Sequence, residues 1–146
     1  MIYVIDEDIN QMKPFVLELQ LRSYEVKQIR DADEALDEIQ NLTSEDFLLV
    51  DVMLATHPEP SRSAFSREDT KDFKITGIRL LHRIFNKFTL FPRSNAIMFT
   101  QASSDSMRTE VERYAKNSGC RLLYKNSYED PLSFGDELEK IMKEGK

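Results

Sequence analysis

The chain contains the segment Phe47-Leu48-Leu49-Val50-Asp51, in which four apolar residues run directly into a carboxylate. An apolar run this short is typical of a strand that is buried on both faces of a parallel sheet. The same arrangement opens the sequence, where the apolar run Ile2–Ile5 is followed by the acidic residues Asp6 and Glu7. Both segments therefore predict a buried strand that delivers acidic side chains at its carboxyl end.

Three further segments continue the pattern. The mainly apolar runs Ala96–Phe99 and Cys120–Tyr124 end at Thr100 and Lys125. The weaker, alternating run Val26–Ile29 is typical of a strand nearer the edge of a sheet. Segments whose apolar residues recur at helical spacing lie between these runs. The alternation of strands and helices predicts a parallel sheet covered by helices on both faces.

The expected fold is a flavodoxin-like α/β domain, a doubly wound parallel sheet of five strands in the order 2-1-3-4-5 with five helices. Right-handed crossovers bring the carboxyl ends of all the strands to one edge of the sheet. In this order the first and third strands are neighbours, so the carboxylates of Asp6, Glu7 and Asp51 should converge where the strand order reverses. We expect Thr100 and Lys125 to lie close to them.

Residues 52–76 interrupt this rhythm, because they carry no regular period and include the proline-rich stretch His57–Ser61. Loops of this length are uncommon inside compact domains. The segment is expected to be a long loop after the third strand. It is either a lid or partner-docking loop over the site, or a surface insertion that costs little loop entropy. The sequence shows no repeat or linker, so we expect residues 1–146 to form one domain.

Composition limits the kind of site that the chain can hold. The net charge of −6 argues against broad nucleic-acid binding, which favours a basic surface. Two histidines and one cysteine are too few for a transition-metal site or an internal disulfide, so any metal should be a hard cation held by oxygen. No apolar run is long enough for a membrane helix, and the first residues lack a signal-peptide pattern. We therefore expect a cytoplasmic protein without direct membrane contact.

The clustered carboxylates predict the chemistry of the site. At neutral pH, carboxylates that lie close together repel each other and favour a bound cation. Mg²⁺ suits such a cluster, because it takes one or two carboxylates and keeps several waters. An aspartate can itself attack phosphorus to give an aspartyl-phosphate, and a nearby ammonium such as that of Lys125 can neutralise the transferred group.

These segments resemble the receiver domain of two-component response regulators over essentially the whole chain. The motifs that carry the resemblance are Ile5-Asp6-Glu7-Asp8, Leu49-Val50-Asp51, Met98-Phe99-Thr100 and Leu123-Tyr124-Lys125. The resemblance implies that Asp51 accepts a phosphoryl group from a histidine kinase or phosphotransfer protein. It also implies that Mg²⁺ is held by Glu7, Asp51 and the backbone carbonyl of Met53, with Asp6 acting through water. Lys125 would pair with the phosphoryl oxygens, and Thr100 would move to hydrogen-bond them.

By the same resemblance, the domain catalyses its own phosphorylation and turns over no external substrate, so it is not expected to be an enzyme in the usual sense. Its output would pass to a downstream effector protein, or to an output domain that lies outside this sequence. A homodimer through the last two helices is a further expectation.

Two alternatives remain open. Gln101 follows Thr100 where the family has a small residue, Leu122 stands where it has an aromatic, and residues 52–76 lengthen the chain. These differences favour a degenerate receiver that acts as a phosphorylation-independent interaction module. A third, enzymatic interpretation takes Asp6-Glu7-Asp8 as the nucleophile motif of a haloacid-dehalogenase-like phosphatase.

Overall fold

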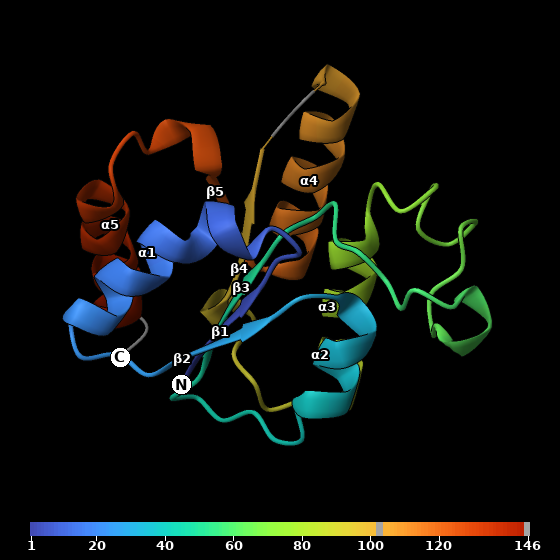
Figure 1. Ribbon diagram of the computed structural model, residues 1–146, viewed down its shortest axis with the longest axis horizontal. Coiled ribbons are helices and arrows are strands. Elements are labelled where there is room, and N and C mark those ends of the chain that lie inside the picture. Colours follow the sequence, from blue (N-terminus) through green and yellow to red (C-terminus); the bar gives the residue numbers. More distant parts are fainter. Residues whose placement is uncertain (102–103, 145–146) are drawn as a thin grey trace.

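The computed structural model describes residues 1–101 and 104–144 of the chain. Within these residues, five strands alternate with five α-helices (Figure 1). The strands are β1 (Ile2–Ile5), β2 (Val26–Ile29), β3 (Phe47–Val50), β4 (Ala96–Thr100) and β5 (Arg121–Tyr124). The helices are α1 (Ile9–Leu21), α2 (Ala32–Glu38), α3 (Thr76–Lys87), α4 (Asp105–Ser118) and α5 (Pro131–Glu144).

The strands form one parallel sheet in the order β2-β1-β3-β4-β5. The predicted fold class, with its strand order and its edge position for β2, is therefore confirmed. The boundaries differ by one residue at two strands, since β4 includes Thr100 and β5 begins after Cys120. In the central strand β3 all four side chains are buried, as expected for a strand that is covered on both faces.

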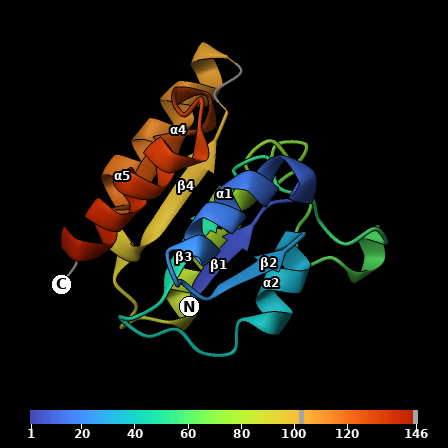
Figure 2. The same ribbon diagram turned by 60° about the vertical axis from the view of Figure 1, so that its left-hand side comes forward.

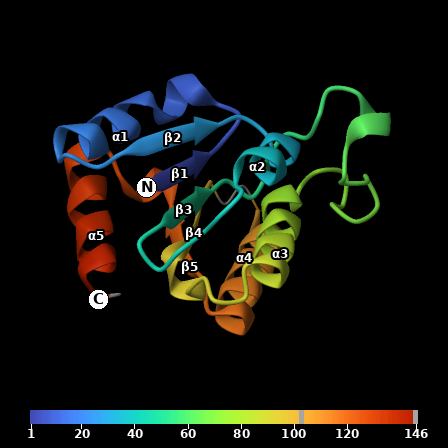
Figure 3. The ribbon, with the colours of Figure 1, turned by 90° about the horizontal axis from the view of Figure 1, so that it is seen from below.

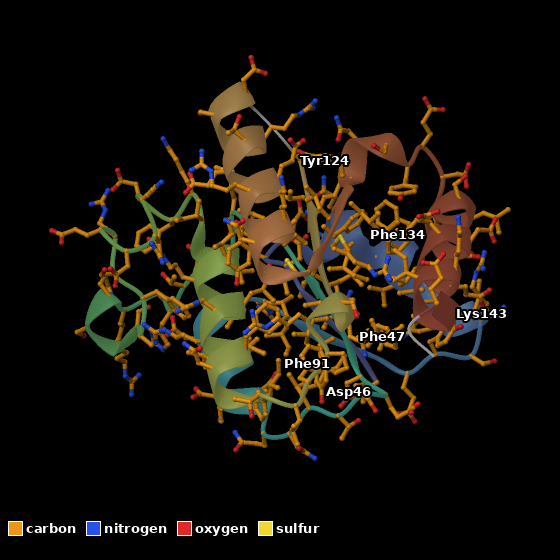
Figure 4. All side chains as sticks on the ribbon, turned by 180° about the vertical axis from the view of Figure 1, so that it is seen from behind. Asp46, Phe47, Phe91, Tyr124, Phe134 and Lys143 are labelled. Atoms are coloured by element: carbon orange, nitrogen blue, oxygen red, sulfur yellow. The ribbon has the colours of Figure 1, made fainter. Side chains whose placement is uncertain are left out.

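The helices cover the two faces of the sheet unequally. Helices α1 and α5 lie against one face, while α2, α3 and α4 lie against the other (Figures 2 and 3). Alternate residues of each strand point to opposite faces, so Ile5 and Val50 enter the core on the α2–α4 side, whereas Val4 and Leu49 enter the core on the α1–α5 side. Phe134 of α5 points into the core on the α1–α5 side, where its ring stacks on that of Phe99 with 4.8 Å between the ring centroids (Figure 4).

Polar side chains cap the first turns of α2 and α4. The Asp31 carboxylate accepts a hydrogen bond from the Glu34 amide at 2.7 Å, and the Ser104 hydroxyl accepts one from the Met107 amide at 3.2 Å. Such caps satisfy amide groups that have no partner inside the helix. At the other end of α4, Gly119 adopts a left-handed conformation with φ of 84°, which glycine reaches without steric cost.

The segment 52–76 is a well-anchored arm that extends from the α2–α3 side of the molecule (Figure 1). The Asp33 carboxylate of α2 accepts hydrogen bonds from the His57 amide at 2.7 Å, the Ser63 hydroxyl at 2.8 Å and the Ala64 amide at 2.7 Å. Phe65 is buried in the core beneath it. The predicted long loop is present, and it contains a single 3-10 turn at Pro60–Arg62.

No helix in residues 1–101 or 104–144 combines the length and the apolar character that crossing a membrane requires.

Candidate functional site

The carboxyl ends of four strands bring the predicted polar residues together at one edge of the sheet. Asp6 follows β1, Asp51 follows β3, Thr100 ends β4, and Lys125 follows β5. The sheet ladder holds the first two in place, because the Asp6 amide donates to the Ile29 carbonyl and the Asp51 amide donates to the Ile5 carbonyl, each at 3.0 Å. The backbone geometry of a parallel sheet therefore sets the spacing between these carboxylates.

Lys125 is the positive centre of this group. Its ammonium lies 2.5 Å from Oδ2 of Asp6 and 3.5 Å from Oδ2 of Asp51, and its side chain is only 6% exposed. A buried charge is stable only where it is paired and hydrogen-bonded. The ammonium therefore bridges the carboxylates of two neighbouring strands.

Thr100 contacts the other oxygen of Asp51. Its hydroxyl donates to Oδ1 of Asp51 at 3.1 Å, and the threonine itself is buried. The carboxylate of Asp51 thus accepts from a hydroxyl on one oxygen and faces an ammonium on the other.

The backbone of α3 approaches the end of β3 closely and so fixes the position of Asp51. Gly77, in the first turn of α3, donates its amide to the Val52 carbonyl at 2.9 Å. A Cβ atom added at Gly77 would lie 2.1 Å from the carbonyl oxygen of Asp51, which is far inside van der Waals contact. Only glycine permits α3 to start this close to the end of β3.

Burial and neighbouring carboxylates raise the pKa of two carboxyl groups at the site. Burial raises the pKa of Asp51 to about 6, and the neighbouring Asp6 carboxylate adds to the increase, while Lys125 and the Thr100 hydrogen bond oppose it. The pKa of Glu7 is also raised, first by burial and then by the Asp6 and Asp8 carboxylates. Burial first, and then the charge of the neighbouring carboxylates, therefore disfavours the ionised form of both groups.

These groups line an open cavity of about 190 Å³. Its walls are Asp6, Glu7, Asp8, Gln11, Asp51, Met53, Thr100, Gln101 and Lys125. All the residues predicted for the site are therefore brought to one cavity, including Glu7 and Met53, for whose predicted roles as metal ligands the structure provides no direct contact. Gln101, which stands where the receiver family has a small residue, is exposed and also lines this cavity.

The donor set suits a hard divalent cation. The four carboxylates of the cavity wall outnumber its single ammonium, so a bound divalent cation would reduce the excess of negative charge. In the part of the chain that the structure describes, no group of three His, Cys, Asp or Glu side chains is arranged to hold a metal ion. Mg²⁺ needs only one or two protein carboxylates and keeps several waters, so the pair Asp6 and Asp51 with Glu7 at the rim is compatible with it.

Sequence reasoning named Asp8 within the acidic motif without giving it a role of its own, and it missed Gln11. The amide of Asp8 donates to Oδ1 of Asp6 at 2.9 Å, and Oε1 of Gln11 accepts from the Lys125 ammonium at 3.3 Å. The sequence did carry a signal for both residues, because a helix that begins directly after Asp6 and Glu7 places its first turn beside this acidic pair. Gln11 was overlooked because its partner lies 114 residues away along the chain.

Comparisons with known proteins give a consistent result for the fold. No protein-family model matches the sequence, and no curated protein sequence matches it. Among solved structures, a CheY-like receiver domain protein from Methanospirillum hungatei is similar, with a TM-score of 0.67 and 19% identity over 99% of this chain and 94% of that one. The receiver domain of NtrX from Brucella abortus gives a TM-score of 0.64 and 17% identity over 99% and 97%.

A third similar structure, the BeF3-activated receiver domain of DrrB, has a TM-score of 0.64 and 18% identity over 97% of this chain and 96% of that one. At identities this low, the structural similarity establishes the fold alone, and this fold is that of response regulator receiver domains.

Proposed function

We propose that this chain, which has the receiver fold, is a response regulator receiver domain that accepts a phosphoryl group on Asp51 and signals through a change of conformation. The observation that supports this proposal most strongly is the convergence on Asp51 of the Lys125 ammonium at 3.5 Å and the Thr100 hydroxyl at 3.1 Å. Each of these groups can stabilise negative charge on a phosphoryl group bound to Asp51.

The proposed reaction is a phosphoryl transfer from a histidine kinase or phosphotransfer protein. A carboxylate oxygen of Asp51 attacks phosphorus, the bond from phosphorus to the donor's imidazole nitrogen breaks, and the imidazole then takes a proton from water. Glu7, Asp51 and the Met53 carbonyl would hold Mg²⁺, with Asp6 acting through water, and the bound ion would supply charge neutralisation for the phosphoryl oxygens. At neutral pH most Asp51 is ionised despite its pKa of about 6, so the nucleophile is available.

The residues around Asp51 hold it ready for this step. Gly77 and the β3 ladder fix its backbone, and Thr100 orients its carboxylate. Lys125 already lies within the cavity, so only a small movement separates its ammonium from a phosphoryl oxygen. The protein turns over no external substrate in this role, and its output passes to an effector protein or to an output domain.

Beryllofluoride, a mimic of the phosphoryl group, tests the proposal. Calorimetric titration of beryllofluoride into the protein with saturating Mg²⁺ should show one binding site per chain, and Asp51→Asn should abolish it because the anchoring carboxylate is lost. Thermal unfolding should report the same event as a rise in melting temperature for the wild type alone. Absence of binding to the wild type would remove the support for phosphorylation.

A second candidate is a receiver-like module that binds its partner without phosphorylation. The 2.5 Å pair between Lys125 and Asp6 favours it, because the charges already neutralise each other inside the protein. Under this alternative, the titration with beryllofluoride gives no heat for either the wild type or Asp51→Asn.

A phosphatase would instead hydrolyse a generic phosphate ester steadily, and would lose this activity in Asp6→Asn but not in Asp51→Asn.

A further inference from the structure

Gln11, in the first turn of α1, reaches across the cavity to the Lys125 ammonium. An ammonium has three N–H donors and no acceptor. Its surroundings offer three oxygen atoms: Oδ2 of Asp6 at 2.5 Å, Oε1 of Gln11 at 3.3 Å and Oδ2 of Asp51 at 3.5 Å. Gln11 is the neutral member of this set.

The backbone of Gln11 is tied to the site by a short chain of hydrogen bonds. Its amide donates to Oδ1 of Asp8 at 2.9 Å, which makes Asp8 the cap of α1. The amide of Asp8 in turn donates to Oδ1 of Asp6 at 2.9 Å. The first turn of α1 and the acidic residue after β1 therefore hold one position relative to each other.

The side chain of Gln11 does not play the role that its helix position predicts. An acidic cap followed three residues later by Gln or Glu forms a capping box, in which the later side chain bonds to the amide of the cap residue. Here the amide of Asp8 is taken by Asp6, and the Oε1 atom of Gln11 accepts from Lys125 instead. The helix cap is complete without this side chain, so its contact with Lys125 serves the site.

We propose that Gln11 is a positioning residue that holds the Lys125 ammonium over Asp51 without adding negative charge to the cavity. This inference rests on the proposed function. To pair with a phosphoryl oxygen, the ammonium must give up one of its three contacts and still keep its remaining N–H groups satisfied. The amide oxygen of Gln11 satisfies one of them, whereas a carboxylate would retain the ammonium and repel the incoming phosphoryl group.

Two substitutions of Gln11 separate these effects. Gln11→Met keeps the length of the side chain but removes the acceptor, and Gln11→Glu keeps the acceptor but adds a charge. The matched control is Gln20→Met, the same replacement at an exposed position of α1 outside the cavity. Each variant is titrated by calorimetry with Mg²⁺ alone, then with beryllofluoride at saturating Mg²⁺, and its thermal unfolding is recorded without metal.

We expect Gln11→Met to weaken beryllofluoride binding about tenfold, in line with a lost hydrogen bond to a charged group, with Mg²⁺ affinity changed less than about twofold. Gln11→Glu should weaken beryllofluoride binding further. Its melting temperature should not fall, because an acidic residue in the first turn stabilises a helix. Gln20→Met should match the wild type.

The inference is overturned if Gln11→Met binds beryllofluoride as tightly as Gln20→Met while the wild type binds it normally. It is also overturned if Gln11→Met loses Mg²⁺ and beryllofluoride affinity equally, since that result assigns Gln11 to the metal side of the cavity. A wild type that binds Mg²⁺ but no beryllofluoride contradicts the proposed function itself, and the role of Gln11 is rejected with it.

Discussion

Asp51 is the residue in which function and stability conflict. The fold buries its carboxylate beside Asp6, and the pKa of about 6 shows that the ionised form is unfavourable in the folded state. Lys125 and Thr100 relieve this cost only in part. Functional sites commonly retain such strain, because the same charge that weakens the fold is the one that the chemistry requires.

This conflict predicts that Asp51→Asn stabilises the protein at pH 7 in the absence of metal. Because the folded pKa of about 6 lies above the ordinary value of 3.8 for an aspartate, the wild type loses stability as the pH rises from about 4 to about 6. Asparagine has no charge to bury, so the variant should gain about 2–3 kcal/mol at pH 7 and almost nothing near pH 4. Urea unfolding in chelator-containing buffer at the two pH values measures the difference.

Asp37→Asn, at an exposed position of α2, is the control and should change stability little at either pH. A loss of stability in Asp51→Asn at pH 7 would show that the carboxylate contributes more to the fold than its burial costs.

At the scale of elements, one carboxylate of α2 accepts several hydrogen bonds from the arm of residues 52–76. Asp33 accepts three hydrogen bonds from the arm, and Phe65 packs into the core beside them. At its far end the arm contacts α4 through the ion pair between Lys71 and Glu110 at 2.7 Å. The arm therefore contacts both α2 and α4.

Asp33→Ala should release the arm, because three donors lose their acceptor at once. We expect a loss of about 2–3 kcal/mol in the free energy of unfolding. Hydrogen exchange should become faster at the amides of His57 and Ala64, which donate to this carboxylate. Asp37→Ala, on the exposed face of the same helix, is the matched control. Unchanged exchange at both amides would mean that the other contacts of the arm, such as the burial of Phe65 and the Lys71–Glu110 ion pair, hold it in place without Asp33.

At the scale of the whole molecule, the alternation of short apolar runs with helical segments was enough to predict the fold. Short apolar runs such as Phe47–Val50 identify buried strands, and right-handed crossovers then restrict the order of the strands. The convergence of Asp6, Asp51, Thr100 and Lys125 followed from that order, because parallel strands end at the same edge.

The features that sequence reasoning missed depend on contacts between distant residues. The anchoring of the arm links Asp33 to residues 24 to 31 positions later, and nothing in the local sequence marks it. The consecutive residues Lys71, Asp72 and Phe73 adopt positive φ of 52°, 58° and 65° without a glycine, which local preferences argue against. The tertiary structure overrides the local preference in this turn.

The central claim is that Asp51 is a phosphoryl acceptor, and its most direct test is mass spectrometry of the intact protein after incubation with Mg²⁺ and a small phosphodonor such as acetyl phosphate. The wild type should gain the mass of one phosphoryl group, and peptide mapping should place it on residue 51. Asp51→Asn should gain nothing under the same conditions. An unmodified wild type, or an equal gain in Asp51→Asn, would contradict the account.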